Sequence, residues 1–310
     1  MMLVRAVVVS KYGPPEGLKL VEVDKPTPKA NELLVKIHAT TVTFGDAMLR
    51  RMGFGSRLVL GLFMGGLGKN KILGHEFAGK IEAVGNKVTL FKPGDQVFGS
   101  AGMKGGTYAE YISIPEELMI TLKPENMTFE EAATVPIGAH TAYDILRKGN
   151  IESGKEVLIY GASGSVGTYA LQLAKYWEAE VTAVSSAKNH EMTKSLGADS
   201  AIDYKTEDFT QSGKTYDVIF DTVRKLSSSK CESALKENGV FLSTRASTKE
   251  TAENLEFLRE LIEAGKLKPV IDRQYRFEEI SEAHRYVDTG HKRGNVVITM
   301  DTGDAIAQNY

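Results

Sequence analysis

The segment Glu156–Lys175, EVLIYGASGSVGTYALQLAK, constrains the fold of this chain more than any other stretch. Its first five residues form a short apolar run, which is typical of a buried parallel strand. Gly161, Gly164 and Gly167 follow at intervals of three residues, and an amphipathic helical pattern begins at once. A plain glycine-rich loop is the alternative, but each glycine costs backbone entropy without adding packing. The order of strand, glycine turn and helix favours a diphosphate site, because backbone N–H groups and the helix dipole attract an anion.

Composition and charge are those of an ordinary globular protein. The chain has 310 residues, enough for two domains, and its formal charge of −2 gives no basic surface for nucleic acid. Cys231 is the single cysteine, so a disulfide within the chain and a metal site of several thiolates are both excluded. The sequence has no run of transmembrane length and no signal-peptide layout at its start. We therefore expect a cytoplasmic protein without a membrane partner.

The first 122 residues have the pattern of an antiparallel, turn-rich β domain. Short runs between glycine and proline turns predict strands at 3–9, 18–23, 32–39, 78–84, 96–98 and 107–114. The stretch Thr43–Gly68 carries aromatic residues and several glycines without a regular period. Such a stretch suits an irregular loop that lines a substrate cleft.

Strands and helices alternate from residue 123 onwards, which predicts a doubly wound parallel sheet. The expected strands are 156–160, 180–186, 201–204, 216–223 and 240–244. The chain is thus predicted to be an α/β protein of two domains. The first spans 1–122 and is completed by 267–310, and the nucleotide-binding domain spans 123–266.

Several motifs carry a family resemblance: YGPPEGLKL, GHEFAGKIEAVG, FKPGDQVFG, GTYAEYISIP, AATVPIGAHTAY and GASGSVGTYALQLAK. Through them the chain resembles the medium-chain dehydrogenase/reductase superfamily and, within it, the quinone oxidoreductase (zeta-crystallin-like) branch. The resemblance implies a GroES-like catalytic domain and a Rossmann domain. It also implies a dinucleotide bound at the glycine turn by Ala162, Ser163, Gly164, Ser165, Val166 and Gly167. The branch usually has an acidic residue at Lys155 and a glycine at Ser165, and neither change removes a backbone donor.

The resemblance also bears on zinc. Zinc alcohol dehydrogenases of this superfamily hold the catalytic metal with two cysteines and the histidine of a GHE motif. Here His75 is present, but Thr43 or a close neighbour and Ile137 stand where the cysteines would lie. A catalytic zinc needs about three protein ligands, so we predict no zinc. The GHE motif is then interpreted as the start of a strand held by side-chain hydrogen bonds.

One departure from the family concerns the edge of the parallel sheet. Relatives usually have a sixth strand after the segment that matches Val240–Thr244, and that strand commonly mediates dimerisation. Here Arg245–Glu250 leads directly into the next helix. The oligomeric state is therefore left open.

The end of the second parallel strand indicates which nicotinamide cofactor is bound. NAD sites place a carboxylate there to accept from the ribose hydroxyls, whereas this chain has Ser185, Ser186 and, two positions on, Lys188. Hydroxyls and a cation favour the 2′-phosphate of NADPH, although a solvated surface charge is the alternative for Lys188. The resemblance adds Tyr204 near that phosphate. It also places Thr141 near the nicotinamide, with a helix-capping hydroxyl as the equal alternative.

Without zinc, an already electrophilic acceptor is the substrate that needs least activation. We therefore expect NADPH-dependent reduction of a quinone or an α,β-unsaturated carbonyl. Thr43, Asp46 and Phe54 lie in the segment that lines the substrate cleft of relatives, and Asp46 can equally be a buried structural carboxylate. An NADP-dependent alcohol or carbonyl oxidoreductase and a non-catalytic NADPH-binding regulator remain as alternatives.

Overall fold

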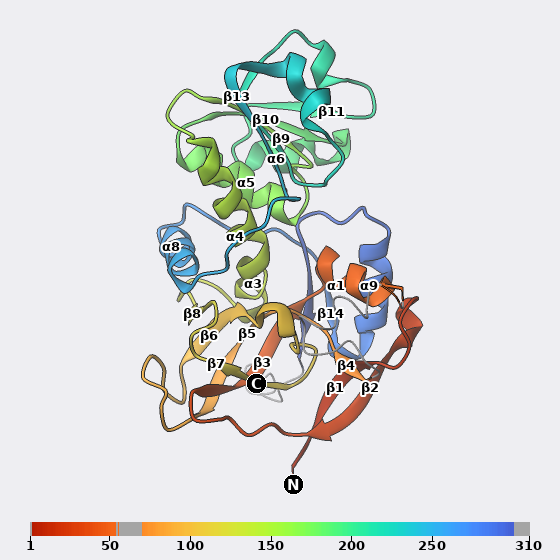
Figure 1. Cartoon of the computed structure of the whole chain (residues 1–310), viewed down its shortest axis with the longest axis vertical. Helices are drawn as coiled ribbons and strands as arrows, with labels where there is room; N and C mark the ends of the chain where they lie inside the picture. Colours follow the sequence, from red (N-terminus) through yellow and green to blue (C-terminus); the bar gives the residue numbers. More distant parts are fainter. Residues whose placement is uncertain (1, 54, 56–69, 301–310) are drawn as a thin grey trace, which may run out of the picture. The chain divides into compact units, whose positions relative to one another are not determined.

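The computed structural model describes residues 2–53, 55 and 70–300, and the chain divides into two compact units (Figure 1). Unit 1 comprises Met1–Ile137, Glu250–Arg259 and Ile271–Tyr310, and unit 2 comprises Gly138–Lys249 and Glu260–Val270. The first division therefore falls inside helix α4 (Val135–Leu146) rather than at the predicted 122/123.

Residues 123–137, which the sequence assigned to the nucleotide-binding domain, belong to unit 1. In helix α3 (Phe129–Ala132), the Phe129 ring stacks on His38 with centroids 4.2 Å apart. Helix α8 (Ala252–Glu263) also begins in unit 1, where its Glu256 carboxylate accepts a hydrogen bond from the Thr121 hydroxyl. Both contacts join residues that are distant in sequence, so a local pattern could not reveal them.

The described strands of unit 1 form two mainly antiparallel sheets. The smaller sheet has the order β2-β1-β4 and is built from β1 (Leu3–Val9), β2 (Leu18–Asp24) and β4 (Lys71–Ile72). The larger sheet has the order β14-β15-β3-β5-β6-β8. Its strands are β3 (Glu32–Thr41), β5 (Glu76–Val84), β6 (Gln96–Ser100), β8 (Ile120–Leu122), β14 (Ile271–Arg276) and β15 (Asn295–Thr299). Strand β7 (Tyr111–Pro115) pairs with the first half of β3.

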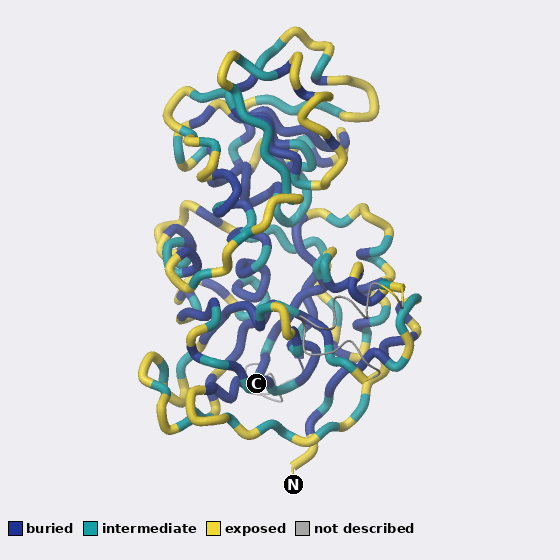
Figure 2. Tube along the Cα trace, viewed as in Figure 1, coloured by how far each residue is buried: buried dark blue, intermediate teal, exposed yellow. Residues whose placement is uncertain are grey.

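The core of unit 1 lies between these strands and helix α9 (Ile280–Asp288). Val35 and Ile37 of β3 and Ile298 of β15 are fully buried in it. Figure 2 shows the same pattern, with buried backbone along the strands and exposed backbone in the connections. Residues 267–270, predicted to belong here, fall in unit 2.

Part of the stretch expected to be an irregular loop is helical. Residues Phe44–Arg51 form helix α1, which begins at Thr43 with a capping box. The Thr43 side chain accepts from the N–H of Asp46, and the Asp46 side chain accepts from the N–H of Thr43. Local capping therefore outweighs the weak helical period of the sequence. Residues 56–68 lie outside the described part of the chain.

Unit 2 is a parallel sheet with the order β11-β10-β9-β12-β13, which confirms the predicted doubly wound fold. The strands are β9 (Glu156–Tyr160), β10 (Glu180–Ser185), β11 (Ser200–Asp203), β12 (Tyr216–Asp221) and β13 (Leu235–Ser243). Its helices include most of α4 and the whole of α5 (Ser165–Tyr176), α6 (His190–Ser195) and α7 (Ser228–Cys231). Leu158, Tyr216 and the thiol-bearing Cys231 belong to the buried core.

Strand β13 forms one edge of this sheet. Within the part of the chain that the structure describes, Arg245–Glu250 contains no sixth strand and leads to α8. The sixth strand that relatives usually have after this edge is therefore absent from the described residues. No helix of the described residues is long and apolar enough to cross a membrane.

Candidate active site

The glycine turn of unit 2 forms a compact backbone cradle between β9 and α5. Gly161 has a φ of +83°, a conformation that side chains rarely adopt. Gly164 ends the turn, and its N–H donates to the Gly161 carbonyl oxygen at 3.0 Å. A Cβ atom on Gly167 would lie 2.2 Å from that same oxygen. Glycine is thus required at 161 by conformation and at 167 by close packing.

This cradle fits a dinucleotide diphosphate. Gly164 is the N-cap of the twelve-residue helix α5 and makes no side-chain cap hydrogen bond. No side chain of Gly164 therefore covers the positive end of the helix dipole. The residues predicted to bind the cofactor lie together at this point: Ala162, Ser163, Gly164, Ser165, Val166 and Gly167. A Cβ on Gly164 would make only an ordinary van der Waals contact, 3.5 Å from the Gly161 oxygen.

The residues predicted to select NADPH lie at the carboxyl end of β10. The Ser185 carbonyl oxygen accepts from the N–H of Tyr204 at 3.3 Å, which brings the two strand ends together. The Ser186 hydroxyl accepts from the side chain of Asn189 at 3.2 Å. Ser185 and Ser186 are both buried, whereas Tyr204 is 43% exposed.

Lys188 projects from the turn that follows β10. It is exposed, and its ammonium group has no ion-pair partner among the residues that the structure describes. The nearest sequence neighbours in this turn supply hydroxyl and amide groups, not carboxylates. A free cation beside neutral hydrogen-bonding groups fits a phosphate monoester.

Thr141 lies within α4, in unit 2 and half-buried. Because α4 begins at Val135, Thr141 is inside the helix, and the alternative of a helix-capping hydroxyl is wrong. Its predicted place near the nicotinamide stays a prediction.

In unit 1, Asp46 is a fully buried carboxylate. It accepts hydrogen bonds from the N–H of Thr43 at 2.9 Å and from the Thr43 hydroxyl at 2.6 Å. The structure thus gives both residues a structural role at the start of α1, and the Thr43 hydroxyl is already engaged. Whether they also contact a substrate stays a prediction, and Phe54 lies outside the described residues.

Asp46 has a partner that the sequence did not indicate, His75. The Nδ1 atom of His75 lies 2.6 Å from Oδ1 of Asp46. Burial lowers the pKa of His75, but the neighbouring carboxylate outweighs it, and the pKa is raised overall. Burial raises the pKa of Asp46, but the imidazolium charge of His75 outweighs this effect, and the pKa of Asp46 lies below its usual range. The two directions agree on an imidazolium–carboxylate pair.

The GHE motif therefore has the predicted structural role. Strand β5 begins at Glu76, whose carboxylate accepts from the Thr41 hydroxyl and, at 2.8 Å, from the N–H of Ile137. Burial raises the pKa of Glu76 to about 7. Among the described residues, no group of three or more His, Cys, Asp or Glu side chains could hold a metal ion. The prediction of a zinc-independent enzyme stays a prediction.

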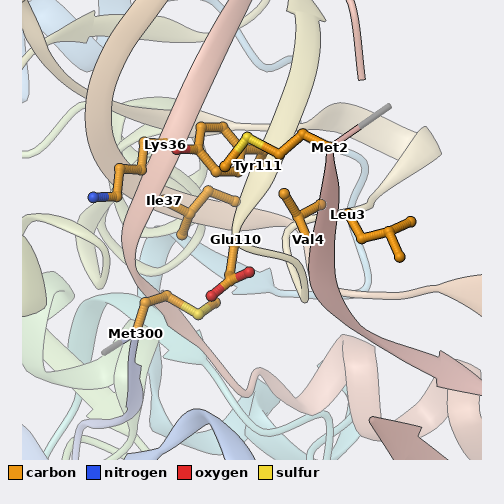
Figure 3. Close-up of a pocket in the computed structure, with 8 residues that line it drawn as sticks. All are labelled: Met2, Leu3, Val4, Lys36, Ile37, Glu110, Tyr111 and Met300. Carbon is orange, nitrogen blue, oxygen red and sulfur yellow. The ribbon is translucent and has the colours of Figure 1, made fainter. Parts of the chain in front are cut away.

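Unit 1 also has a small cavity, which none of these residues lines (Figure 3). Its volume is about 200 Å³, below the range of about 300–1,000 Å³ that is usual for small-molecule sites. The lining residues are Met2, Leu3, Val4, Lys36, Ile37, Glu110, Tyr111 and Met300. Because it contains none of the predicted site residues, we do not assign the active site to it.

Comparison with known proteins confirms the family. Residues 29–124 match the family described as alcohol dehydrogenase GroES-like domain. Residues 196–250 and 240–298 match the one described as zinc-binding dehydrogenase. The chain belongs to the medium-chain dehydrogenase/reductase superfamily, as its motifs predicted.

Three named proteins are similar to this chain over most of its length. The chain is 36% identical to 2-methylene-furan-3-one reductase of Solanum lycopersicum, over 93% of this chain and 76% of that protein. It is 32% identical to the chloroplastic NADPH-dependent alkenal/one oxidoreductase of Arabidopsis thaliana, over 95% and 79% respectively. The quinone oxidoreductase from Coxiella burnetii has a similar structure, with a TM-score of 0.83, 28% identity, and coverage of 96% of this chain and 99% of that one.

Proposed function

We propose that this protein is an NADPH-dependent reductase that transfers hydride to a quinone or an α,β-unsaturated carbonyl. The observation that carries the proposal is the cradle of Gly161–Gly167 beside a β10 end that has hydroxyls and Lys188 but no carboxylate. The relatives support the same class, since their names include alkenal/one and quinone oxidoreductases. A small-molecule acceptor follows from this class.

The chain's own residues contribute mainly binding and orientation. The backbone N–H groups of the cradle hold the diphosphate, and Lys188 contacts the 2′-phosphate, where a carboxylate would repel it. The bound NADPH supplies the hydride. Because quinones and enones are electrophilic without metal activation, positioning and exclusion of water can provide much of the rate acceleration.

Lys188→Ala tests the choice of cofactor. A charge-assisted contact is worth roughly 1.5–3 kcal/mol, so NADPH affinity should fall about ten- to a hundredfold. NADH affinity should barely change, because NADH lacks the phosphate. Dissociation constants of both cofactors, measured by calorimetry, decide this. Lys194→Ala removes another exposed charge of the same unit and serves as the control.

The result can go against the proposal in two ways. Equal losses for NADPH and NADH would mean that Lys188 acts on the fold, and a wild type that prefers NADH would overturn the cofactor assignment. Anaerobic mixing of the NADPH complex with a panel of quinones and a panel of alkenals tests the reaction. Absorbance at 340 nm that stays constant with both panels would favour a non-catalytic NADPH-binding protein.

The cellular location is part of the same proposal. We infer a cytoplasmic enzyme from the layout of the sequence alone, and fractionation of cells that produce the protein would test it.

A further inference from the structure

Arg224 adopts a backbone conformation that is costly for an arginine. Its φ is +59°, in the left-handed region, and it lies in the loop between β12 and α7. The other non-glycine residues described there are Asn70, Asn150 and Asn238, of the type that tolerates this region best, and Glu178, which directly follows the C-cap of α5. Strain of this kind persists where the surroundings enforce it, and it is concentrated at ligand sites.

The surroundings of Arg224 hold its conformation through hydrogen bonds on both sides of it. The carboxylate of Asp221 accepts from the N–H of Val223 at 3.0 Å and from the N–H of Leu226 at 2.8 Å. On the other side, the Arg245 guanidinium donates to the carbonyl oxygens of Arg224 at 2.5 Å and Leu226 at 3.1 Å. The loop is thus held at both ends of the strained residue.

This loop touches the glycine turn directly. The Thr222 hydroxyl donates to the carbonyl oxygens of Tyr160 at 2.9 Å and Gly161 at 3.1 Å. A Cβ atom on Gly161 would lie 2.6 Å from Cγ1 of Val223. Strands β10 and β12 flank β9 on opposite sides, so the loop stands across the cradle from Lys188. This is the point where the strand order reverses, and there doubly wound sheets bind their ligands.

The same loop carries an exposed cation, Arg224. Arg224 is exposed, and the described residues give its guanidinium no carboxylate partner. We propose that Arg224 binds the diphosphate of the dinucleotide, from the side of the cradle opposite Lys188. The inference rests on the proposed cofactor site but not on the preference for NADPH. A guanidinium can pair two phosphate oxygens in its fixed fork, which a glycine at this position could not do.

Arg224→Gly separates this role from a role in the fold. Because glycine adopts a φ of +59° freely, the ligand-free variant should unfold at a higher temperature than the wild type. If Arg224 binds the diphosphate, affinities for ADP, NADH and NADPH should all fall, by about tenfold each. Lys188→Ala should instead weaken NADPH alone. Arg224→Lys keeps the charge but not the fork, so it should retain only part of the affinity, and Lys230→Ala, an exposed cation of α7, should change none.

Calorimetric titrations with the three nucleotides and a thermal scan decide the matter. Unchanged affinity for ADP in Arg224→Gly would overturn the proposal. A loss confined to NADPH would also overturn it, because it would place the guanidinium on the 2′-phosphate. A lower unfolding temperature together with uniform losses would assign Arg224 to the fold. If Arg224→Gly behaves as expected while Lys188→Ala does not, only the NADPH preference fails.

Discussion

Replacing His75 with glutamine tests whether the pair that it forms with Asp46 is charged. Glutamine keeps an N–H donor for the carboxylate but has no positive charge. The Asp46 side chain is fully buried and that of His75 is 16% exposed. Removing one partner of a buried ion pair costs about 3–5 kcal/mol. Since His75 keeps some contact with water, we expect about 2–3 kcal/mol of lost unfolding free energy at pH 6.

The loss should depend on pH in a defined direction. The pKa of His75 is raised in the folded protein. Its contribution is therefore fully present below the unfolded-state pKa of about 6.5. It disappears as the pH rises through the raised value, with a slope of at most about 1.4 kcal/mol per pH unit. At pH 9 the difference between wild type and variant should be about 1 kcal/mol or less, as for a neutral hydrogen bond.

Urea unfolding followed by circular dichroism from pH 5.5 to 9 measures this difference. Glu76, with its pKa raised to about 7, titrates in both proteins, so the subtraction removes most of its effect. His291→Gln, at an exposed histidine, is the control and should change the unfolding free energy little. A His75→Gln difference that stays constant between pH 6 and 9, or grows, would refute the charged pair.

Four further predictions concern the glycine cradle, the zinc content and the edge of the parallel sheet. Gly167→Ala should lower the unfolding free energy by about 1–3 kcal/mol, because its methyl group would lie 2.2 Å from the Gly161 oxygen. Gly164→Ala, with its nearest atom at 3.5 Å, should cost about 1 kcal/mol or less while still weakening dinucleotide binding. Elemental analysis should find no stoichiometric zinc, and activity should survive a chelator; one zinc per chain and inactivation by the chelator would contradict this. No dimer should be joined through β13. Light scattering measures the oligomeric state, and a crystal structure of a dimer with β13 paired across the interface would show the reasoning to be wrong.

The sequence revealed most of unit 2 because its signals are local. The glycine turn combines a strand, three spaced glycines and a helix within Glu156–Lys175, and each part can be recognised without the others. The Asp46–His75 pair joins residues that are 29 positions apart, and only the folded sheet brings them together. Helix α1 had a readable signal in its Thr43-x-x-Asp46 capping box, which the aromatic and glycine-rich stretch obscured. The conformation of Arg224 depends on Arg245, 21 residues later, and no local pattern encodes it.

The isolation of Cys231 gives this protein a built-in probe of its own motions. The thiol is fully buried in the core of unit 2, and burial raises its pKa to about 11. Since thiol reagents attack the exposed thiolate, labelling at neutral pH reports how often that core opens. With no second cysteine in the chain, the signal comes from one place. A dinucleotide at a hundred times its dissociation constant should slow the labelling about a hundredfold, if the open form cannot bind it. Affinities too tight for titration could thus be read as rates from the unmodified chain.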